Sequence, residues 1–187
     1  MAMKHIITLL LCLAFLPGRT GAQELALSTN VVDYAMLGTL NLEASVGLAR
    51  HWTLNAGARY NPFSFAKDGG TEQMQLRQRS VSFGMRFWPW HIHSGWWLSA
   101  KLQAQEYNEG GLRSPQTEEG ERYGGGLAAG YTYMLHKHFN LEFGAGLWAG
   151  RNRFTSYACP VCGKVTGGGE RTFVRPNELL LSLIYIF

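Results

Sequence analysis

Residues 178–187, ELLLSLIYIF, carry a large apolar or aromatic side chain at every second position. The members of this series are Leu179, Leu181, Leu183, Tyr185 and Phe187. Side chains two residues apart point to the same side of a β-strand. The stretch therefore predicts a strand with one continuous apolar face, and that face must lie against either lipid or a core.

The same two-residue period recurs through most of the chain. It is clearest over residues 53–63, 80–87, 96–105 and 139–149, where apolar residues alternate with polar residues or glycine. Alternation over this length is the signal of a half-buried strand. We predict eight strands, over residues 26–36, 40–49, 53–63, 77–88, 96–107, 122–135, 139–153 and 172–187. The first is the least regular, because its alternation is blurred at Val31 and Val32.

The connections between these strands alternate in length. Residues 50–51, 89–95 and 136–138 are short connections, whereas residues 64–76, 108–121 and 154–171 are long, polar and rich in glycine or charge. Short turns at one end, long loops at the other and a C-terminal aromatic residue are typical of bacterial outer-membrane barrels, whose tilted strands need about 9–11 residues to span. The sequence thus predicts an all-β fold: an eight-stranded antiparallel up-and-down transmembrane β-barrel in a bacterial outer membrane.

Aromatic residues gather near both ends of the predicted strands. We expect them to form two girdles at the membrane interfaces. Beside the short turns stand Trp52, Trp88, Trp90, Trp96, Trp97 and Phe187, and near the long loops stand Tyr60, Phe63, Tyr107 and Tyr123.

The face opposite the apolar one carries charges on strand after strand. These are Glu43, Arg59, Arg86, Lys101, Glu142 and Glu178. A soluble barrel of this size would fill its interior with apolar groups, and so many charges would not fit a dry core. The charges suit a polar lumen surrounded by lipid. Since an eight-stranded interior only has room for its own side chains, we predict a mutually paired charge network and no large pore, with a narrow porin-like ion or proton path as the alternative.

The first 22 residues read as a cleavable signal peptide. Lys4 precedes a short apolar run over residues 6–16, and Thr20-Gly21-Ala22 resembles a cleavage site. The barrel domain would then comprise residues 23–187. Loss of Lys4 and Arg19 from the 17 basic residues leaves 15 against 13 acidic ones, a formal charge of +2. That balance gives no reason to expect nucleic acid as a partner.

The chain resembles the small eight-stranded outer-membrane proteins of the OmpA and OmpX size class. More narrowly, residues 28–34 (STNVVDY), 41–47 (NLEASVG), 52–54 (WTL) and 60–62 (YNP) resemble the opening of a Bacteroidetes family of unknown function. The resemblance implies a porin-like fold and no known activity. It also implies envelope proteins such as surface-fimbria components as partners.

The sharpest local motif is Cys159-Pro160-Val161-Cys162-Gly163. It resembles one knuckle of a zinc ribbon, but a tetrahedral site needs two more ligands. A secreted protein permits the two thiols to pair, so we expect a Cys159–Cys162 disulfide in the last long loop. Zinc shared with a second molecule is the alternative, and we assign no metal or cofactor.

Other candidate residues lie in short turns and beside the last long loop. His91 with His93, and His136 with His138, stand at alternate positions, where a pair could chelate a metal ion. His93-Ser94 evokes lipid-modifying barrel hydrolases, but adjacent strand residues face opposite sides, so we expect no catalytic residue. A last group could contact lipopolysaccharide phosphates or could simply solvate the loop: Arg151, Arg153, Lys164, Arg171 and Arg175. We therefore expect an outer-membrane structural or interaction protein that presents surface loops, and the alternative is a lipid-modifying enzyme.

Overall fold

The structure, a computed structural model, describes residues 25–66, 73–111, 116–159 and 163–187. The predicted signal peptide, residues 1–22, lies outside this part. The elements in chain order are β1 (Leu25–Asn30), α2 (Val31–Ala35), β2 (Leu40–Ala49), β3 (Trp52–Asn61), β4 (Ser64–Ala66), β5 (Gln73–Phe87), β6 (Gly95–Gly110), β7 (Thr117–His136), β8 (Phe139–Tyr157) and β9 (Val165–Ile186).

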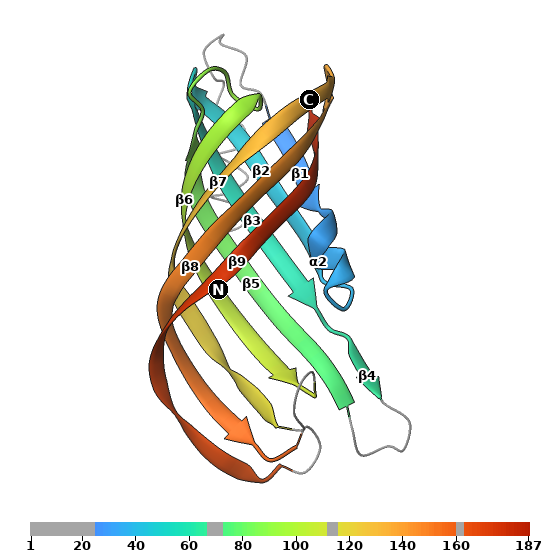
Figure 1. Cartoon of the computed structure of the whole chain (residues 1–187), viewed down its shortest axis with the longest axis vertical. Helices are drawn as coiled ribbons and strands as arrows, with labels where there is room; N and C mark the ends of the chain where they lie inside the picture. Colours follow the sequence, from blue (N-terminus) through green and yellow to red (C-terminus); the bar gives the residue numbers. More distant parts are fainter. Residues whose placement is uncertain (1–24, 67–72, 112–115, 160–162) are drawn as a thin grey trace, which may run out of the picture.

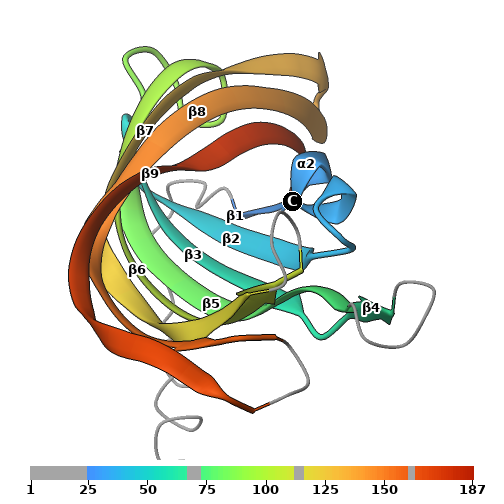
Figure 2. The same cartoon turned by 60° about the horizontal axis from the view of Figure 1, so that its bottom comes forward.

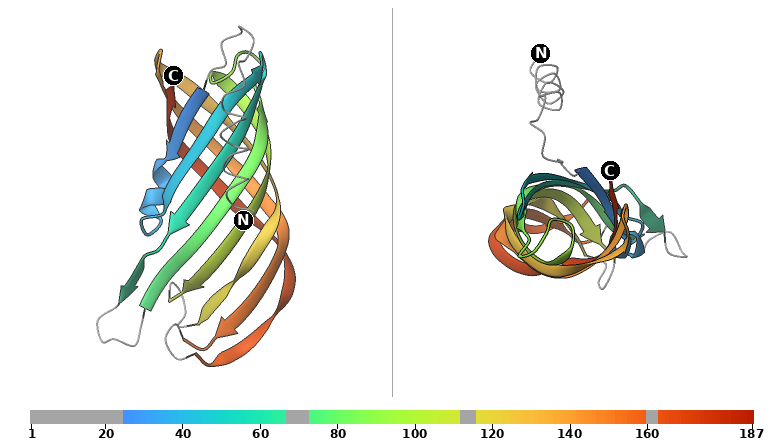
Figure 3. Two further views of the ribbon diagram at one scale, coloured as in Figure 1. Left: turned by 180° about the vertical axis from the view of Figure 1, so that it is seen from behind. Right: turned by 90° about the horizontal axis from the view of Figure 1, so that it is seen from above.

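The strands form a closed antiparallel barrel in which each strand lies beside its neighbour in the chain (Figure 1). β1 pairs with β9 and closes the ring, and β3 pairs with both β2 and β5. The three-residue β4 pairs with β5 beyond the end of β3, so the nine named strands make an eight-stranded wall (Figure 3). The predicted all-β, eight-stranded antiparallel fold is confirmed. Among the described residues, no helix is long and apolar enough to cross a membrane.

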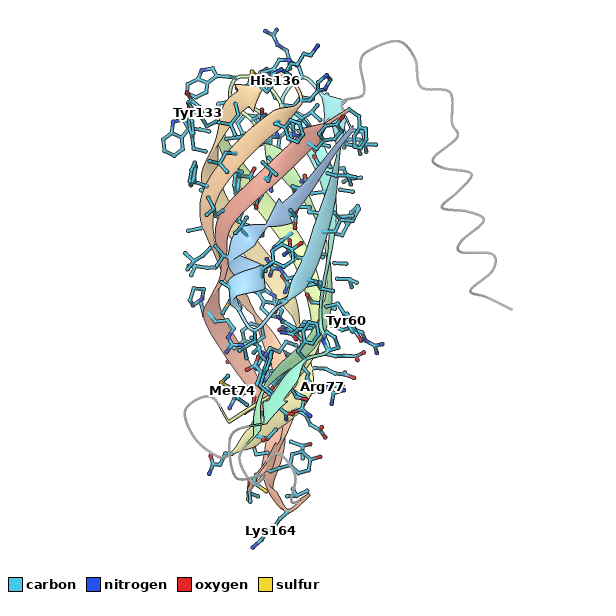
Figure 4. The ribbon with its side chains drawn as sticks, turned by 90° about the vertical axis from the view of Figure 1, so that its right-hand side faces the viewer. Tyr60, Met74, Arg77, Tyr133, His136 and Lys164 are labelled. Carbon is cyan, nitrogen blue, oxygen red and sulfur yellow. The ribbon has the colours of Figure 1, made fainter. Side chains whose placement is uncertain are left out.

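The wall is much taller on one side than on the other. β7, β8 and β9 have 20, 19 and 22 residues, whereas β1 has only 6. In Figure 2 the long strands β7, β8 and β9 continue past α2, which lies where the short side of the wall ends. We call the end with the C-terminus and the short turns the turn end, and the opposite one the outer end; Figure 4 labels His136 at the first and Lys164 at the second.

Two predicted loops were wrong in extent. Much of residues 108–121 and 154–171 continues the strands, because β6 runs to Gly110, β7 begins at Thr117 and β9 begins at Val165. Polar, glycine-rich sequence had suggested loops, but residues 165–172 of β9 are all exposed, and a strand without a buried face needs no apolar alternation.

The first predicted strand ends early, at Asn30. The Asn30 side chain accepts a hydrogen bond from the Val32 amide (3.2 Å), which caps α2. The same side chain donates to the Leu179 carbonyl (3.1 Å) and accepts from the Leu181 amide (3.1 Å) of β9. Asn30 therefore replaces two strand hydrogen bonds at the point where the chain leaves the sheet and starts a helical turn.

The barrel is apolar outside and polar inside. The outward belt includes Leu98, Leu102, Leu127, Leu147 and Val174, all more than half exposed. The buried side chains that the structure describes are mostly polar or charged, among them Thr53, Arg86, Arg122, Asn140 and Glu142. This arrangement is the reverse of a soluble barrel, and it follows from the two-residue alternation of the strands.

Candidate functional site

An aromatic cluster fills the lumen at the turn end. Trp88 and Trp97 are 0% and 1% exposed, their rings lie 6.5 Å apart, and Ile92 and Ala128 complete the cluster. The ring of Trp97 lies so close to β7 that a Cβ on Gly130 would be 2.4 Å from its Cζ2 atom. We call Trp88, Ile92, Trp97 and Ala128 the aromatic plug. The sequence had placed both tryptophans in an outer girdle, and that was wrong, whereas Trp90 and Trp96 are exposed.

His93 adjoins this plug. Its ring packs edge-on against Trp88 at 5.6 Å, and its carbonyl accepts a hydrogen bond from the Asn140 side chain (2.6 Å). The residue is 2% exposed and has a φ of 61° in the left-handed region. The imidazole is thus buried in a turn that folds into the barrel at the turn end.

A first charge layer lies directly on the plug. Arg86 contacts Glu142 at 2.6 Å and Glu43 at 3.1 Å, and its guanidinium lies 4.2 Å from the centre of the Trp97 ring. Thr132 donates a hydrogen bond to Glu142 (3.1 Å) and Asn55 donates one to Glu43 (2.9 Å). Three of the six residues predicted to face the lumen thus meet in one group, which we call the Arg86 layer. Each carboxylate thus has the Arg86 cation and a further polar neighbour.

A second group lies behind α2. Arg59 binds Asp33 of α2 at 2.8 Å, and both residues line a cavity of about 40 Å³ together with Lys101. The Arg86 layer forms another wall of this cavity. Its volume and polar lining suit about two or three water molecules. Sequence reasoning missed Asp33, because a strand over residues 26–36 gave no reason to fold this carboxylate back into the lumen.

A third group fills the outer end and was also missed. Arg122, 4% exposed, holds Glu109 with two hydrogen bonds (2.7 and 3.2 Å) and lies 3.3 Å over the Tyr107 ring. Glu118 accepts from the hydroxyl of Tyr107 (2.5 Å) and from Arg171 (2.7 Å). The alternation of β7 could have revealed Arg122, which is in phase with the inward residues Ala128 and Thr132. We call these residues the Arg122 layer.

A row of outward charges marks where the apolar belt stops. The register of β5 to β9 places Arg79, Glu106, Glu121, Arg153 and Glu170 side by side across five strands. Arg79 binds Glu106 at 2.6 Å, while Arg151 and Arg153 share Glu170 at 3.2 and 3.6 Å. Tyr107 lies beyond this row, where its burial and its hydrogen bond to Glu118 raise its pKa to about 12.

Several predicted residues stay apart from these groups. The backbone of Glu178 pairs with Gly146, and its side chain is outside the described part. Cys159 is disulfide-bonded. Cys162 is not among the described residues, so the Cys159–Cys162 pairing stays a prediction. Arg171, expected at the end of the last long loop, and Arg175, expected in the last strand, both belong to β9 and come close to Glu118 and Glu109.

The histidine pairs remain at the turn end. The rings of His136 and His138 have centres 6.1 Å apart, and His138 stacks on Tyr185. Within the residues that the structure covers, no group of three or more histidine, cysteine or acidic side chains is placed to hold a metal ion.

Comparison with known proteins identifies the family alone. Neither the curated proteins nor the solved structures contain a significant match. The model of the family "Protein of unknown function (DUF3575)" matches residues 6–187, almost the whole chain. With its eight-stranded barrel and layered polar lumen, the chain belongs to this family of unknown function.

Proposed function

We propose that this protein is a bacterial outer-membrane barrel that carries no solute flow and acts through contacts at its outer end. By strand number and size we assign it to the OmpA and OmpX class. The observation that carries the proposal is the inverted barrel: a belt of exposed apolar side chains surrounds a lumen of paired ions. Water would expose that belt at a cost of about 25 cal/mol per Å², whereas lipid would cover it.

The belt gives a direct test through Leu127. This side chain is 71% exposed and lies on β7 midway between the outward aromatics Tyr123 and Tyr131. Leu127→Arg should destabilise the barrel in phospholipid vesicles by about 2–4 kcal/mol, because it moves a charge to the middle of the bilayer. Urea titration of the vesicle-inserted protein, followed by tryptophan fluorescence, measures the change.

Val165→Arg is the matched control. Val165 is 59% exposed but lies beyond the outward charge row, so the same change should alter stability by less than about 0.5 kcal/mol. Equal effects of the two substitutions, or full solubility of the processed protein without detergent, would contradict a membrane belt.

The lumen supports a closed barrel over the alternative of a narrow channel. The aromatic plug, the Arg86 layer and the Arg122 layer follow one another along the barrel axis, and the cavity that the Arg86 layer lines is only about 40 Å³. Purified protein in planar bilayers should therefore show no steady conductance. Porin-sized openings would favour transport instead.

We also propose that the protein is not an enzyme. His93 is packed against Trp88 at the turn end, away from the outer leaflet where a lipid hydrolase would act. Incubation with lipid A should leave its acyl chains intact. The partners that fit best are outer-membrane lipid, lipopolysaccharide and other envelope proteins, which meet the belt, the charge row and the outer end.

A further inference from the structure

β9 has an open edge along most of its length. It pairs with β8 from Val165 onward, but its pairing with β1 begins only where Asn30 meets Ser182. Among the described residues, no strand lies beside the other edge of β9 from Val165 to Leu181. The short strand β1 and the single turn of α2 are the cause, because they close only the half of the wall near the turn end (Figure 1).

The geometry of the sheet identifies which backbone groups face this opening. Leu179 and Leu181 face outward and direct their carbonyl and amide towards Asn30, on the β1 side. Side-chain direction and hydrogen-bond direction alternate together along a strand, so the outward residues further along β9 also turn their backbone groups to that side. Beyond the bulge these are Val174, Thr172 and Glu170. Pro176, which has no N–H, stands between them and Leu179, inside the apolar belt.

Two of the three open residues, Glu170 and Thr172, lie where water and a partner can reach them, whereas Val174 belongs to the apolar belt. Glu170 belongs to the outward charge row, and Thr172 is one step inside it. Residues 163–172 are all exposed, and a Cβ on Gly167 or Gly169 would meet nothing within 4 Å. Glycines without neighbours let a second backbone approach closely. Pro176 thus hinders strand pairing in the part of the edge that lies within the apolar belt, whereas the part nearer the outer end is accessible.

Charge indicates what such a partner would carry. Arg171 and Arg175 face the inner side of this edge and are 50% and 43% exposed. The contact of Arg175 with Glu109 is loose, at 3.8 Å, because Glu109 already binds Arg122 at 2.7 Å. Arg171 is already held by Glu118 at 2.7 and 2.8 Å, so a carboxylate on that face of an added strand would meet mainly Arg175.

A second copy of the chain fits this edge less well. Two β9 strands can pair about a two-fold axis in only a few registers that keep inward residues opposite inward ones. Those centred on Glu170 or Arg171 put like charges directly opposite, and the one centred on Phe173 pairs Arg171 with Arg175. Registers centred on Gly168, Gly169 or Thr172 avoid this conflict, so a second copy has fewer acceptable registers than a strand that carries carboxylates.

We propose that the edge of β9 from Gly168 to Thr172 is a docking site for an extended acidic segment of another protein, which adds as a further strand to the barrel wall. Backbone hydrogen bonds to the open edge give affinity, and Arg175 selects acidic side chains on alternate positions. The inference goes beyond the proposed location, since docking needs only the folded barrel.

Fluorescence polarisation with the full-length barrel in detergent micelles tests the site. The probe is a labelled peptide of roughly eight residues that alternates threonine with glutamate, and its comparison is the same peptide with lysine in place of glutamate. We expect the glutamate peptide to bind at least about tenfold more tightly than the lysine peptide. Methylation of alternate backbone nitrogens should abolish binding, because it removes the donors that face the edge.

Two substitutions locate the site on β9. Thr172→Pro removes one amide from the open edge and should weaken binding about tenfold, and proline is tolerated on such an edge. Arg175→Gln should reduce the preference for glutamate, whereas Arg79→Gln, on the outward face of β5 and paired with Glu106, should leave it unchanged. Heat-dependent mobility in gels verifies that each variant is folded.

Two kinds of result would overturn the proposal. One is equal binding of the glutamate and lysine peptides to the folded barrel, or unchanged binding by folded Thr172→Pro. The other is a dimer of the barrel that Thr172→Pro dissolves, since this would assign the edge to a second copy. Neither result would alter the effect of Leu127→Arg in vesicles, so failure of the docking site and failure of the membrane location can be told apart.

Discussion

Arg86→Ala should destabilise the barrel by about 3–5 kcal/mol, because it leaves two carboxylates in the lumen without their cation. Glu142 is 3% exposed and bonded to Arg86 at 2.6 Å, and Glu43 is bonded to the same guanidinium at 3.1 Å. The substitution also removes the cation over the Trp97 ring. Urea unfolding of the protein in phospholipid vesicles measures the loss.

Arg79→Ala is the control, since its ion pair has the same length in a different setting. Arg79 meets Glu106 at 2.6 Å, but the two side chains are 70% and 54% exposed on the outer wall. Solvent screens such a pair, and its loss should cost no more than about 1 kcal/mol. Similar effects of the two alanine substitutions would show that water reaches the Arg86 layer freely.

A second variant separates the stranded charge from lost packing. Glu142→Gln added to Arg86→Ala should recover part of the stability, because the amide keeps its hydrogen bond with Thr132 and carries no charge. If the double variant were as unstable as the single one, packing of the arginine stem against Trp97 would be the main contribution.

The wall of the barrel could be predicted from the sequence because strand alternation is a local property. The alternation from Leu179 to Phe187, like that of Arg86 with Phe87, indicates which face of the strand each side chain occupies. This information is enough to separate the residues of the outward belt from those of the lumen. The strand ends were harder. β9 extends to Val165 through Gly167, Gly168 and Gly169, which show no alternation because both faces meet water.

Helix α2 forms because of one capping side chain, and the hydrophobic pattern of the sequence does not predict it. Val31 and Val32 favour a strand, but Asn30 caps a helical turn and at the same time holds Leu179 and Leu181 of β9. These contacts join residues that are separated by 149 and 151 positions in the sequence. The local sequence of the first strand therefore cannot predict them. The placement of Asp33 beside Arg59 follows from this turn.

The sequence predicted that the charged side chains face the lumen, but it did not predict the level along the barrel axis at which they meet. Alternation placed Glu43, Arg86 and Glu142 towards the axis, yet their meeting at one level depends on the register of strands β2, β5 and β8. Register is a tertiary property, set by turns and bulges. For the same reason the sequence did not show that Arg122 would meet Glu109 from the next strand.

Trp97→Ala should have a comparable effect, about 3–5 kcal/mol, because it leaves a cavity in the aromatic plug. The ring is 1% exposed, lies against Trp88 and Gly130, and supports the guanidinium of Arg86 at 4.2 Å. The surrounding sheet cannot collapse into the space, since its backbone is fixed by hydrogen bonds on both sides. Loss of the plug should also admit water to the Arg86 layer, which planar-bilayer recordings would detect as small, flickering conductance.

Trp96→Ala is the matched comparison, because it removes the same side chain one residue earlier from the same strand. Trp96 faces outward, is 57% exposed and touches Tyr131 edge-on at 5.2 Å. Lipid would fill the space that it leaves, so no cavity forms, and the cost should be less than half that of Trp97→Ala, with no conductance. The pair tests the orientation of the whole wall: adjacent residues point to opposite sides of β6, and only one of them closes the lumen. A larger loss at Trp96 than at Trp97 would mean that the apolar side chains, rather than the ions, face the barrel axis.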